Sequence, residues 1–307
     1  MCDTATLLAL IMSNSVAILT DRRNTLMSQF ANYTLVSEDY DSTRIPVGVD
    51  TILSCLSRTG VPISEQTVLE AGCGTGNYLH AVRPHLGSIA GIDFNEGMLA
   101  QARTKLGEDV ELTCGSVLDL PYENERFDGI ICNQVIHHLE EGPSAADDPA
   151  GWKPCSFSNV SRFIQEAYRA LRPGGAFVLN ATTLDQFPQG YWWADLIPAA
   201  AARMRCRLPE LDQMIQMFAE AGFEIESVSP DLEGILQGPS YLDPSGPLSE
   251  AWRAGDSTWS LVSDAELDSA RQWVEQRNLE GKMQAFLDER EKNRLTVGQA
   301  TFFCGRK

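Results

Sequence analysis

Short apolar runs alternate with helix-like patterns along this chain from residue 64 onward. Runs rich in Val, Ile, Leu and Phe that are bounded by glycine and polar residues are typical of strands. We expect seven strands, at residues 67–71, 88–93, 110–115, 128–133, 176–182, 223–228 and 300–304. Helical spacing of apolar residues predicts helices at 76–83, 95–106, 160–171 and 210–221. Strands that alternate with helices predict an α/β fold whose parallel sheet is covered on both faces.

Two long segments exceed what such a sheet needs. Residues 141–158 are rich in Pro, Gly, Ser and Asp, and residues 231–298 separate the last two strands, with helical patterns near 248–255 and 264–292. Long segments on a compact scaffold are either functional lids or disordered. The expected domains are an N-terminal leader and helical cap (1–63), a core (64–230 and 299–307) and a mainly helical inserted segment on the acceptor side (231–298).

The first strand ends in a glycine-rich turn with the sequence E-A-G-C-G-T-G-N at residues 70–77. Glycine tolerates positive φ and lets a ligand approach the backbone, and the start of a helix offers free N–H groups. The turn therefore predicts a nucleotide-like cofactor. The dinucleotide fingerprint G-x-G-x-x-G would place its third glycine at position 77, where this chain has Asn77.

A second feature supports the cofactor prediction. Asp93 ends the second strand about twenty residues after Gly72, and an acid at that offset can accept hydrogen bonds from ribose hydroxyls. A glycine turn alone is equally typical of an ordinary connection between strand and helix. The combination of turn and acid favours a cofactor that contains ribose.

Five blocks carry a resemblance to a known family. They are E-x-G-x-G-x-G at 70–76, G-I-D-F at 91–94, G-S-V-L-D-L-P at 115–121, F-D-G…H-H-L at 127–139 and L-R-P-G-G at 171–175. In this order they resemble the class I S-adenosylmethionine-dependent methyltransferases, especially the small-molecule group related to the ubiquinone and menaquinone methyltransferases. The resemblance covers residues 64–182. It implies a Rossmann-like, doubly wound sheet of seven strands, with strand 7 antiparallel between strands 5 and 6, an N-terminal helical cap and an insertion between strands 6 and 7.

The resemblance also implies an enzyme of class EC 2.1.1 that uses S-adenosyl-L-methionine as co-substrate and no metal. Glycines 72, 74 and 76 would bring the backbone to the methionine part of this molecule, and Glu70 would orient that turn or bind the amino group. Asp93 would hold the ribose, while Phe94 and Val117 would frame the adenine. The implied contacts with the co-substrate are therefore Glu70, Gly72, Gly74, Gly76, Asp93, Phe94, Ser116, Val117 and Asn133.

Ser116 departs from the family pattern, and Asn133 has more than one possible role. Ser116 stands where the family has an acid, so it can offer the adenine a hydrogen bond without charge. Asn133, at the end of the fourth strand, is expected to hold either the amino-acid end of the co-substrate or the acceptor, or to cap the strand end.

Candidates for catalysis are few. A sulfonium methyl group is already electrophilic, so a base is needed only for an acceptor that must lose a proton. His137 and His138 follow the fourth strand, at the sheet edge where ligands bind, and either can serve as base, or the pair can start a helix and contact co-substrate or core. In related enzymes the N-terminal segment closes the acceptor pocket, which here would bring in Tyr33, Tyr40, Asp41 and Arg44, or the same tyrosines can pack on the sheet. Tyr40 is a third catalytic candidate, and Tyr33 a substrate contact.

The acceptor pocket is expected in the second half of the chain, because all the tryptophans lie after residue 150. Tyr191, Trp192 and Trp193 can form an aromatic wall that attracts a cation, or they can pack the inserted helices. The scarcity of bases favours a nitrogen or sulfur acceptor, such as the thioether amino acid methionine. A quinone or polyketide oxygen or carbon, with a histidine base, is the alternative.

Composition narrows the partners and the setting. A net charge of −18 disfavours nucleic acid as partner. Eight cysteines without a C-x-x-C pair, and only four histidines, give a metal site no support and favour a reducing, cytoplasmic setting.

The N-terminal apolar run is not expected to span a membrane, and the assembly state and two rival functions stay open. The apolar run at 5–20 is interrupted by polar residues and is too short to cross a bilayer, and Met27 is an alternative start that would leave residues 1–26 outside the folded protein. The assembly state, a homodimer included, stays open. An NAD-dependent oxidoreductase, against which Asn77 speaks, and a non-catalytic cofactor-binding protein are the rival functions.

Overall fold

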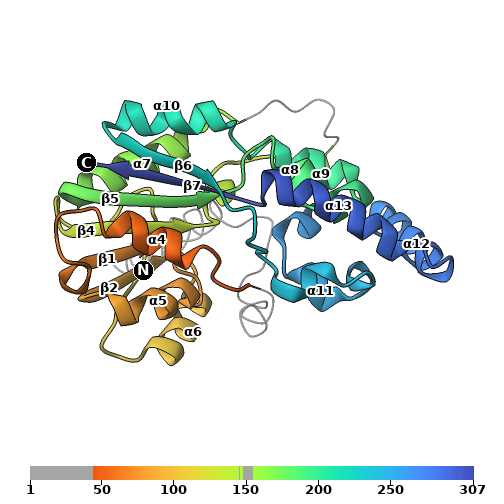
Figure 1. Ribbon diagram of the computed structural model, residues 1–307, viewed down its shortest axis with the longest axis horizontal. Helices are drawn as coiled ribbons and strands as arrows, with labels where there is room; N and C mark the ends of the chain where they lie inside the picture. Colours follow the sequence, from red (N-terminus) through yellow and green to blue (C-terminus); the bar gives the residue numbers. More distant parts are fainter. Residues whose placement is uncertain (1–43, 145, 148–154) are drawn as a thin grey trace, which may run out of the picture.

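The computed structural model describes residues 44–144, 146, 147 and 155–307, and a seven-stranded sheet forms its centre (Figure 1). The strand order is β3-β2-β1-β4-β5-β7-β6, and β7 runs antiparallel to both β5 and β6 while the other pairs are parallel. The strands are β1 Thr67–Ala71, β2 Ser88–Asp93, β3 Glu111–Cys114, β4 Phe127–Asn133, β5 Leu171–Ala181, β6 Glu224–Pro230 and β7 Thr301–Arg306. This topology confirms the predicted fold class. The predictions for Tyr33, Tyr40, Asp41 and the leader with Met27 lie outside the described residues.

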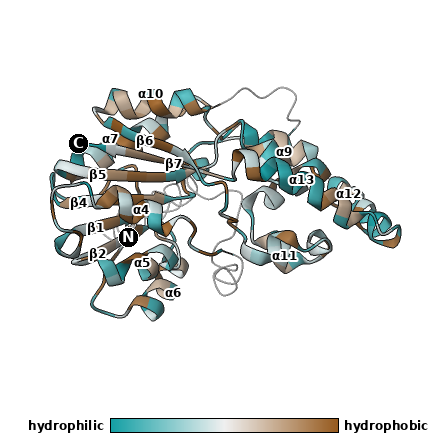
Figure 2. Ribbon diagram, viewed as in Figure 1, coloured by the Kyte–Doolittle hydropathy of each residue, from teal (hydrophilic) through white to brown (hydrophobic). Residues whose placement is uncertain are grey.

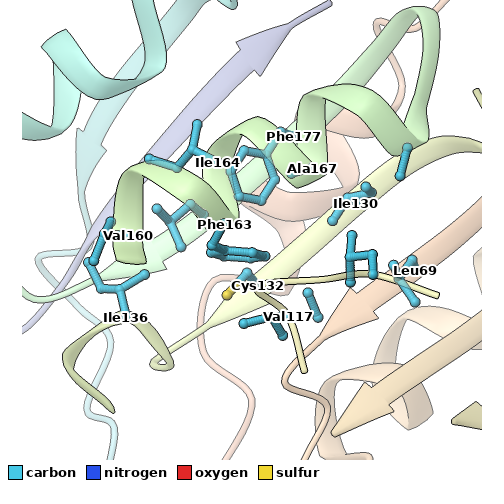
Figure 3. Packing of buried hydrophobic residues seen from close by; sticks show 14 of the residues in the cluster. Leu69, Val117, Ile130, Cys132, Ile136, Val160, Phe163, Ile164, Ala167 and Phe177 are labelled. Carbon is cyan, nitrogen blue, oxygen red and sulfur yellow. The ribbon is translucent and has the colours of Figure 1, made fainter. Parts of the chain in front are cut away.

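Helices cover both faces of the sheet. One face packs against α4, α5 and α6, and the other packs against α7 and α10. Their bounds are α4 Val49–Leu56, α5 Asn77–Val82, α6 Glu96–Leu106, α7 Ser158–Ala170 and α10 Leu211–Ala221. The strands supply apolar side chains to both faces, as buried parallel strands do. Figure 3 shows Phe163 and Ile164 of α7 over Phe177 and Ile130 of the sheet.

The start of β5 differs from the prediction. The strand begins at Leu171 rather than 176, because Leu171 pairs with Phe127 before the chain bulges out through the L-R-P-G-G turn and pairs again from Ala176 onward. Gly174 has a left-handed φ of 79° in this bulge. The turn was therefore correctly recognised in the sequence, but it lies within the strand.

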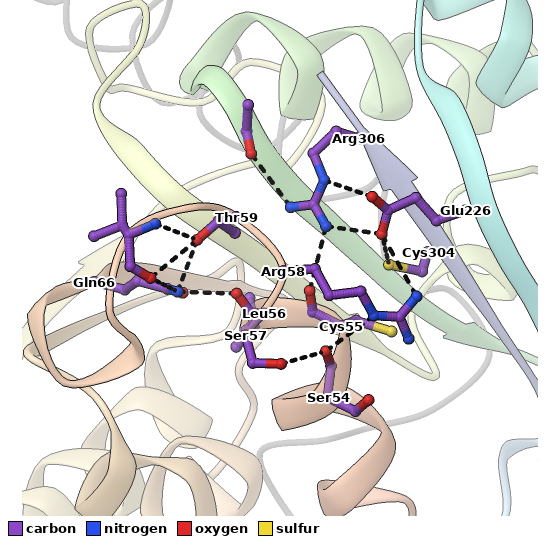
Figure 4. A network of polar contacts seen from close by, with 12 residues as sticks. Ser54, Cys55, Leu56, Ser57, Arg58, Thr59, Gln66, Glu226, Cys304 and Arg306 are labelled. Carbon is purple, nitrogen blue, oxygen red and sulfur yellow. Dashed lines mark hydrogen bonds and ion pairs between the residues drawn. The ribbon is translucent and has the colours of Figure 1, made fainter.

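A polar network joins α4 to the antiparallel edge of the sheet (Figure 4). Arg306 of β7 donates to both carboxylate oxygens of Glu226 of β6, at 2.9 and 2.7 Å, and to the carbonyl oxygen at the end of α4, Cys55 O, at 3.5 Å. The buried Gln66 Nε2 donates to Leu56 O at 2.9 Å just before β1. These contacts fix the helix whose N-terminal flank reaches the site described below.

A second hydrophobic core lies beside the sheet and is built mainly from two separate parts of the chain, within 187–208 and 236–287, together with Val47. Its helices are α8 Phe187–Gly190, α9 Pro198–Arg205, α11 Glu250–Ala254, α12 Asp264–Leu279 and α13 Met283–Val297. Figure 1 shows α12 and α13 extending away from the sheet, and Figure 2 shows that hydrophilic and hydrophobic residues alternate along both helices. The helical pattern expected at 264–292 is interrupted at Gly281, which has a left-handed φ of 66°. The inserted segment thus shares its core with the connection after β5.

Trp192 and Trp193 lie inside this second core. They are 1% and 0% exposed, and their indole N–H groups donate to Tyr241 O at 2.7 Å and to Gln237 Oε1 at 3.1 Å. Buried indoles with satisfied N–H groups are packing residues. Of the two alternatives given for these tryptophans, the structure has the packing one, because the helices around them cover both rings. No helix of the described residues is long and apolar enough to cross a membrane.

Replacing Trp192 by alanine tests the second core. The expected loss is about 3–5 kcal/mol in the free energy of unfolding, the usual cost of removing a fully buried aromatic side chain. Urea denaturation followed by circular dichroism measures it. The control Trp273→Ala removes a partly exposed ring of α12 and should cost distinctly less. Equal losses would contradict the packing described here.

Candidate active site

Three cavities meet at the carboxyl ends of β1, β2 and β4. Cavity A lies between the glycine turn and the segments after β2 and β4, and cavity B is lined by the same turn together with Glu70 and Arg44. Cavity C lies between the residues after β4 and β5 and the inserted segment. Gln134 lines all three. Ligands of open α/β sheets bind at this edge, so the arrangement offers adjoining spaces for two reactants.

The glycine turn leaves no room for a side chain at its first position. Gly72 has a φ of +75°, and a Cβ atom built there would lie 2.4 Å from Val135 Cγ2. The backbone N–H groups of Gly72 and Cys73 donate to Ile92 O at 2.8 and 3.0 Å, which ties the turn to the end of β2. Gly72 and Gly74 line cavities A and B, while Gly76 packs against Leu106 and lines neither.

Asp93 lines cavity A and holds the turn. Its Oδ2 accepts the N–H of Gly74 at 2.8 Å, and its Oδ1 accepts the N–H of Asn95 at 2.8 Å. Burial raises the pKa of this carboxyl, against the effect of these hydrogen bonds. Each carboxylate oxygen can accept a second hydrogen bond. The residue can therefore bind two hydroxyl groups while it positions the backbone.

Glu70 provides a second, more deeply buried carboxyl, which is 2% exposed and lines cavity B. It accepts hydrogen bonds from Leu79 N at 3.2 Å and Asn133 Nδ2 at 3.1 Å. Burial raises its pKa to about 8. The carboxyl is then largely protonated at neutral pH, and a cation bound beside it would restore its charge.

The predicted adenine contacts are only partly brought together. Phe94 and Val117 line cavity A together with Met98 and Leu139, which gives it apolar walls. Ser116 does not line this cavity, because its hydroxyl turns back and accepts Leu118 N at 3.1 Å. The hydroxyl thus has a turn-forming role in this structure, and its adenine contact stays a prediction.

The two histidines face different cavities. His138 lines cavity A and His137 lines cavity C, with ring centroids 4.0 Å apart in the short helix Ile136–His138. Burial lowers the pKa of His137 to about 4 and lowers the pKa of His138 well below its usual range. Both rings are neutral at pH 7, and His137 Nε2 lies 3.4 Å from Ser257 Oγ.

Tyr191 is the one member of the expected aromatic wall that lines cavity C. Its hydroxyl lies 3.0 Å from Thr182 Oγ1 and donates to Gln299 O at 3.3 Å. Burial raises the pKa of this phenol above its usual range. Tyr191 therefore contributes a neutral, hydrogen-bonded ring to the cavity.

Gln134 is a site residue that the sequence did not reveal. It is the first residue after β4 and has a left-handed φ of 57°, which is strained for a residue other than glycine. Its backbone N–H donates to Asn180 O at 2.9 Å and its Nε2 donates to Asn180 Oδ1 at 2.6 Å. Its place directly after a buried strand was the available signal, but the adjacent histidines were the more conspicuous candidates.

The comparisons with known proteins agree with this geometry. Residues 69–179 match a family model described as a methyltransferase domain. An S-adenosylmethionine-dependent methyltransferase of Mycolicibacterium smegmatis is 26% identical over 176 residues, which cover 57% of each chain. A demethylmenaquinone methyltransferase of Symbiobacterium thermophilum is 27% identical over 188 residues, covering 51% of this chain and 67% of that protein.

A solved structure extends the similarity of the fold. It is a methyltransferase from an antibiotic biosynthesis pathway of Anabaena variabilis, with a TM-score of 0.65 at 19% identity, covering 86% of this chain and 99% of that one. The chain matches little more than half the length of its mycobacterial relative. Residues 69–179 therefore form a methyltransferase domain, and the chain is similar there to the class I S-adenosylmethionine-dependent methyltransferases of the small-molecule type.

Proposed function

We propose that this protein transfers a methyl group from S-adenosylmethionine to a small molecule. The observation that carries the proposal is the meeting of three cavities at Gln134, with one carboxyl group in each of cavities A and B. Adenosine fits cavity A, where Asp93 meets the ribose and Phe94 and Val117 the base. The amino-acid end fits cavity B, where the buried Glu70 receives its ammonium group. Cavity C is left for the acceptor.

The residues of the chain bind and orient both reactants and exclude water. S-adenosylmethionine supplies an electrophilic methyl group, and holding a nucleophile in line with it can contribute about 7–11 kcal/mol to lowering the barrier. The lone pair of the acceptor forms the new bond to carbon while the carbon–sulfur bond breaks, and its electrons remain on S-adenosylhomocysteine. Gln134 lies where the two reactants would meet.

A nitrogen or sulfur acceptor is favoured by the weak basicity of the histidines. With a pKa of about 4, His137 is neutral at pH 7 and is a poor acceptor for a proton that must be removed. A thioether needs no such removal. The alternative is an oxygen or carbon acceptor such as a quinone, with His137 as base. The Symbiobacterium relative is named for a menaquinone precursor, which is an acceptor of this second kind.

The proposal is tested by ligand titration and by transfer of label. S-adenosylhomocysteine should bind to the purified chain and NAD should not. Transfer of a tritiated methyl group into a metabolite extract, with mass identification of the product, should then label one class of small molecule and identify the methylated atom. Binding of NAD instead would support the oxidoreductase. Binding of S-adenosylhomocysteine without transfer to any acceptor would favour the non-catalytic alternative.

Asp93→Ala should weaken S-adenosylhomocysteine binding by about 1.5–3 kcal/mol, which is about ten- to 150-fold in Kd. The variant loses hydrogen bonds to a charged acceptor and also the anchor of the Gly74 N–H group. Isothermal titration calorimetry measures the change. The control Glu96→Ala removes a nearby exposed carboxylate that pairs with Arg103 and should leave Kd unchanged. An unchanged Kd for Asp93→Ala would remove the ribose assignment.

Binding should also release a proton from Glu70. The free protein holds this carboxyl protonated below about pH 8, and the ammonium group of the ligand lowers that pKa by Coulomb attraction. Affinity should therefore rise with pH between about 6 and 8, following the ionisation of the free carboxyl. Calorimetry at pH 7 in buffers of different ionisation enthalpy counts the protons released. Glu70→Gln should abolish the release, and an undiminished release would assign it to another group.

A further inference from the structure

Cavity C contains a buried ion pair between two distant parts of the chain. Arg44 Nη2 lies 3.2 Å from Asp256 Oδ2, and the side chains are 18% and 9% exposed. Arg44 precedes α4, whereas Asp256 lies in the inserted segment directly before the short helix Ser257–Leu261. Both residues line cavity C. Burying two charges is costly, and an apolar pair of similar size often stabilises a protein equally well. Stability alone is therefore a weak explanation for this pair.

The backbone holds both charged residues in place. Asp256 Oδ1 accepts Thr258 N at 2.9 Å, which leaves Oδ2 directed at Arg44. The carbonyl oxygen of Arg44 accepts Asn77 Nδ2 at 2.9 Å, so the cation is attached to the end of the glycine turn. The two opposite charges consequently reach one cavity from two separate parts of the chain.

The remainder of the cavity is neutral. Thr182, Ser257 and Thr258 contribute hydroxyl groups, while Phe187, Met204 and Leu208 form an apolar wall. His137 is uncharged at pH 7, and so is Tyr191. The cavity therefore combines one positive group, one negative group and an apolar wall next to Gln134.

We propose that cavity C binds a small zwitterion of the amino-acid class as the methyl acceptor, with its carboxylate on Arg44 and its ammonium on Asp256. The internal ion pair is then exchanged for two ion pairs with the ligand, so no buried charge is left unpaired. A purely anionic acceptor would be opposed by the net charge of −18. This proposal rests on the methyl transfer proposed above and names its substrate class.

The nucleophile follows from the same geometry. An α-ammonium group held by Asp256 has no lone pair, so the methyl group goes to the side chain of the ligand. A thioether sulfur attacks with its own lone pair and becomes a sulfonium, and no proton leaves. A neutral side-chain nitrogen reacts in the same way and afterwards loses one proton to water. Neither path requires a strong base.

Calorimetry on protein saturated with S-adenosylhomocysteine tests the proposal. The probes are L-methionine, S-methyl-L-cysteine and L-histidine, each with its methyl ester, which lacks the carboxylate, and its N-acetyl form, which lacks the ammonium. At least one free amino acid should bind, and blocking either charge should weaken it at least tenfold. Saturation with S-adenosylhomocysteine but binding of none of the three amino acids would overturn the zwitterion and leave the proposed function standing. Failure of S-adenosylhomocysteine itself to bind would instead refute the function.

Charge variants separate ligand recognition from a merely structural ion pair. Asp256→Asn should weaken the free amino acid at least tenfold, change the binding of its N-acetyl form little, and leave the affinity for S-adenosylhomocysteine unchanged. Arg44→Gln should weaken the free amino acid at least tenfold and change the binding of its methyl ester little; because Arg44 also lines cavity B, its comparison is between free and esterified ligand on saturated protein. The control Asp109→Asn breaks the exposed pair with Arg83 and should change none of these values. If Asp256→Asn weakens charged and blocked ligands equally, the pair only connects the inserted segment to the core and the proposal fails.

Discussion

The carboxylate of Asp93 is the interaction on which the geometry of the site depends. It joins three elements at one edge of the sheet, because it ends β2, accepts the N–H of Gly74 in the turn after β1 and accepts the N–H of Asn95 directly before α6. The turn can approach β2 only because its glycines have left-handed φ and because position 72 has no Cβ against Val135. The two constraints together keep one wall of cavity A formed by backbone, which is the surface that a nucleoside can approach most closely.

Desolvation determines the charges around this wall. The same burial that raises the pKa of Glu70 to about 8 lowers that of His137 to about 4, since it disfavours the charged form of either group. Glu70 and the two imidazoles are therefore mostly neutral in the free protein. Arg44 and Asp256 form an ion pair with each other. A site with this pattern favours ligands that bring charges of their own into cavities B and C.

The sequence predicted the core well because local patterns determine it. Apolar runs located all seven strands, Gly72 and Asp93 were predicted from spacing that reflects backbone geometry, and Glu70 from the resemblance to the family. Contacts over long separations were beyond such patterns. Arg44 and Asp256 are 212 residues apart, and no local signal connects them. The sequence allowed Trp192 and Trp193 either to line the acceptor pocket or to pack inside a hydrophobic core. Only the packing of the inserted helices distinguishes these two positions.

The division of the chain also explains why the acceptor does not follow from family membership. The family model covers residues 69–179, which include most of β1, all of β2 to β4 and most of β5, and therefore the walls of cavity A. Most of cavity C comes from beyond that point, from Thr182 to Leu208 and from Asp256 to Thr258. These residues belong to the second core or directly adjoin it, and that core draws on the inserted segment. A shared core can consequently bind one co-substrate in many relatives while the acceptor is selected by residues that the relatives need not share. Evidence for the acceptor must therefore come from the charges and shape of cavity C itself.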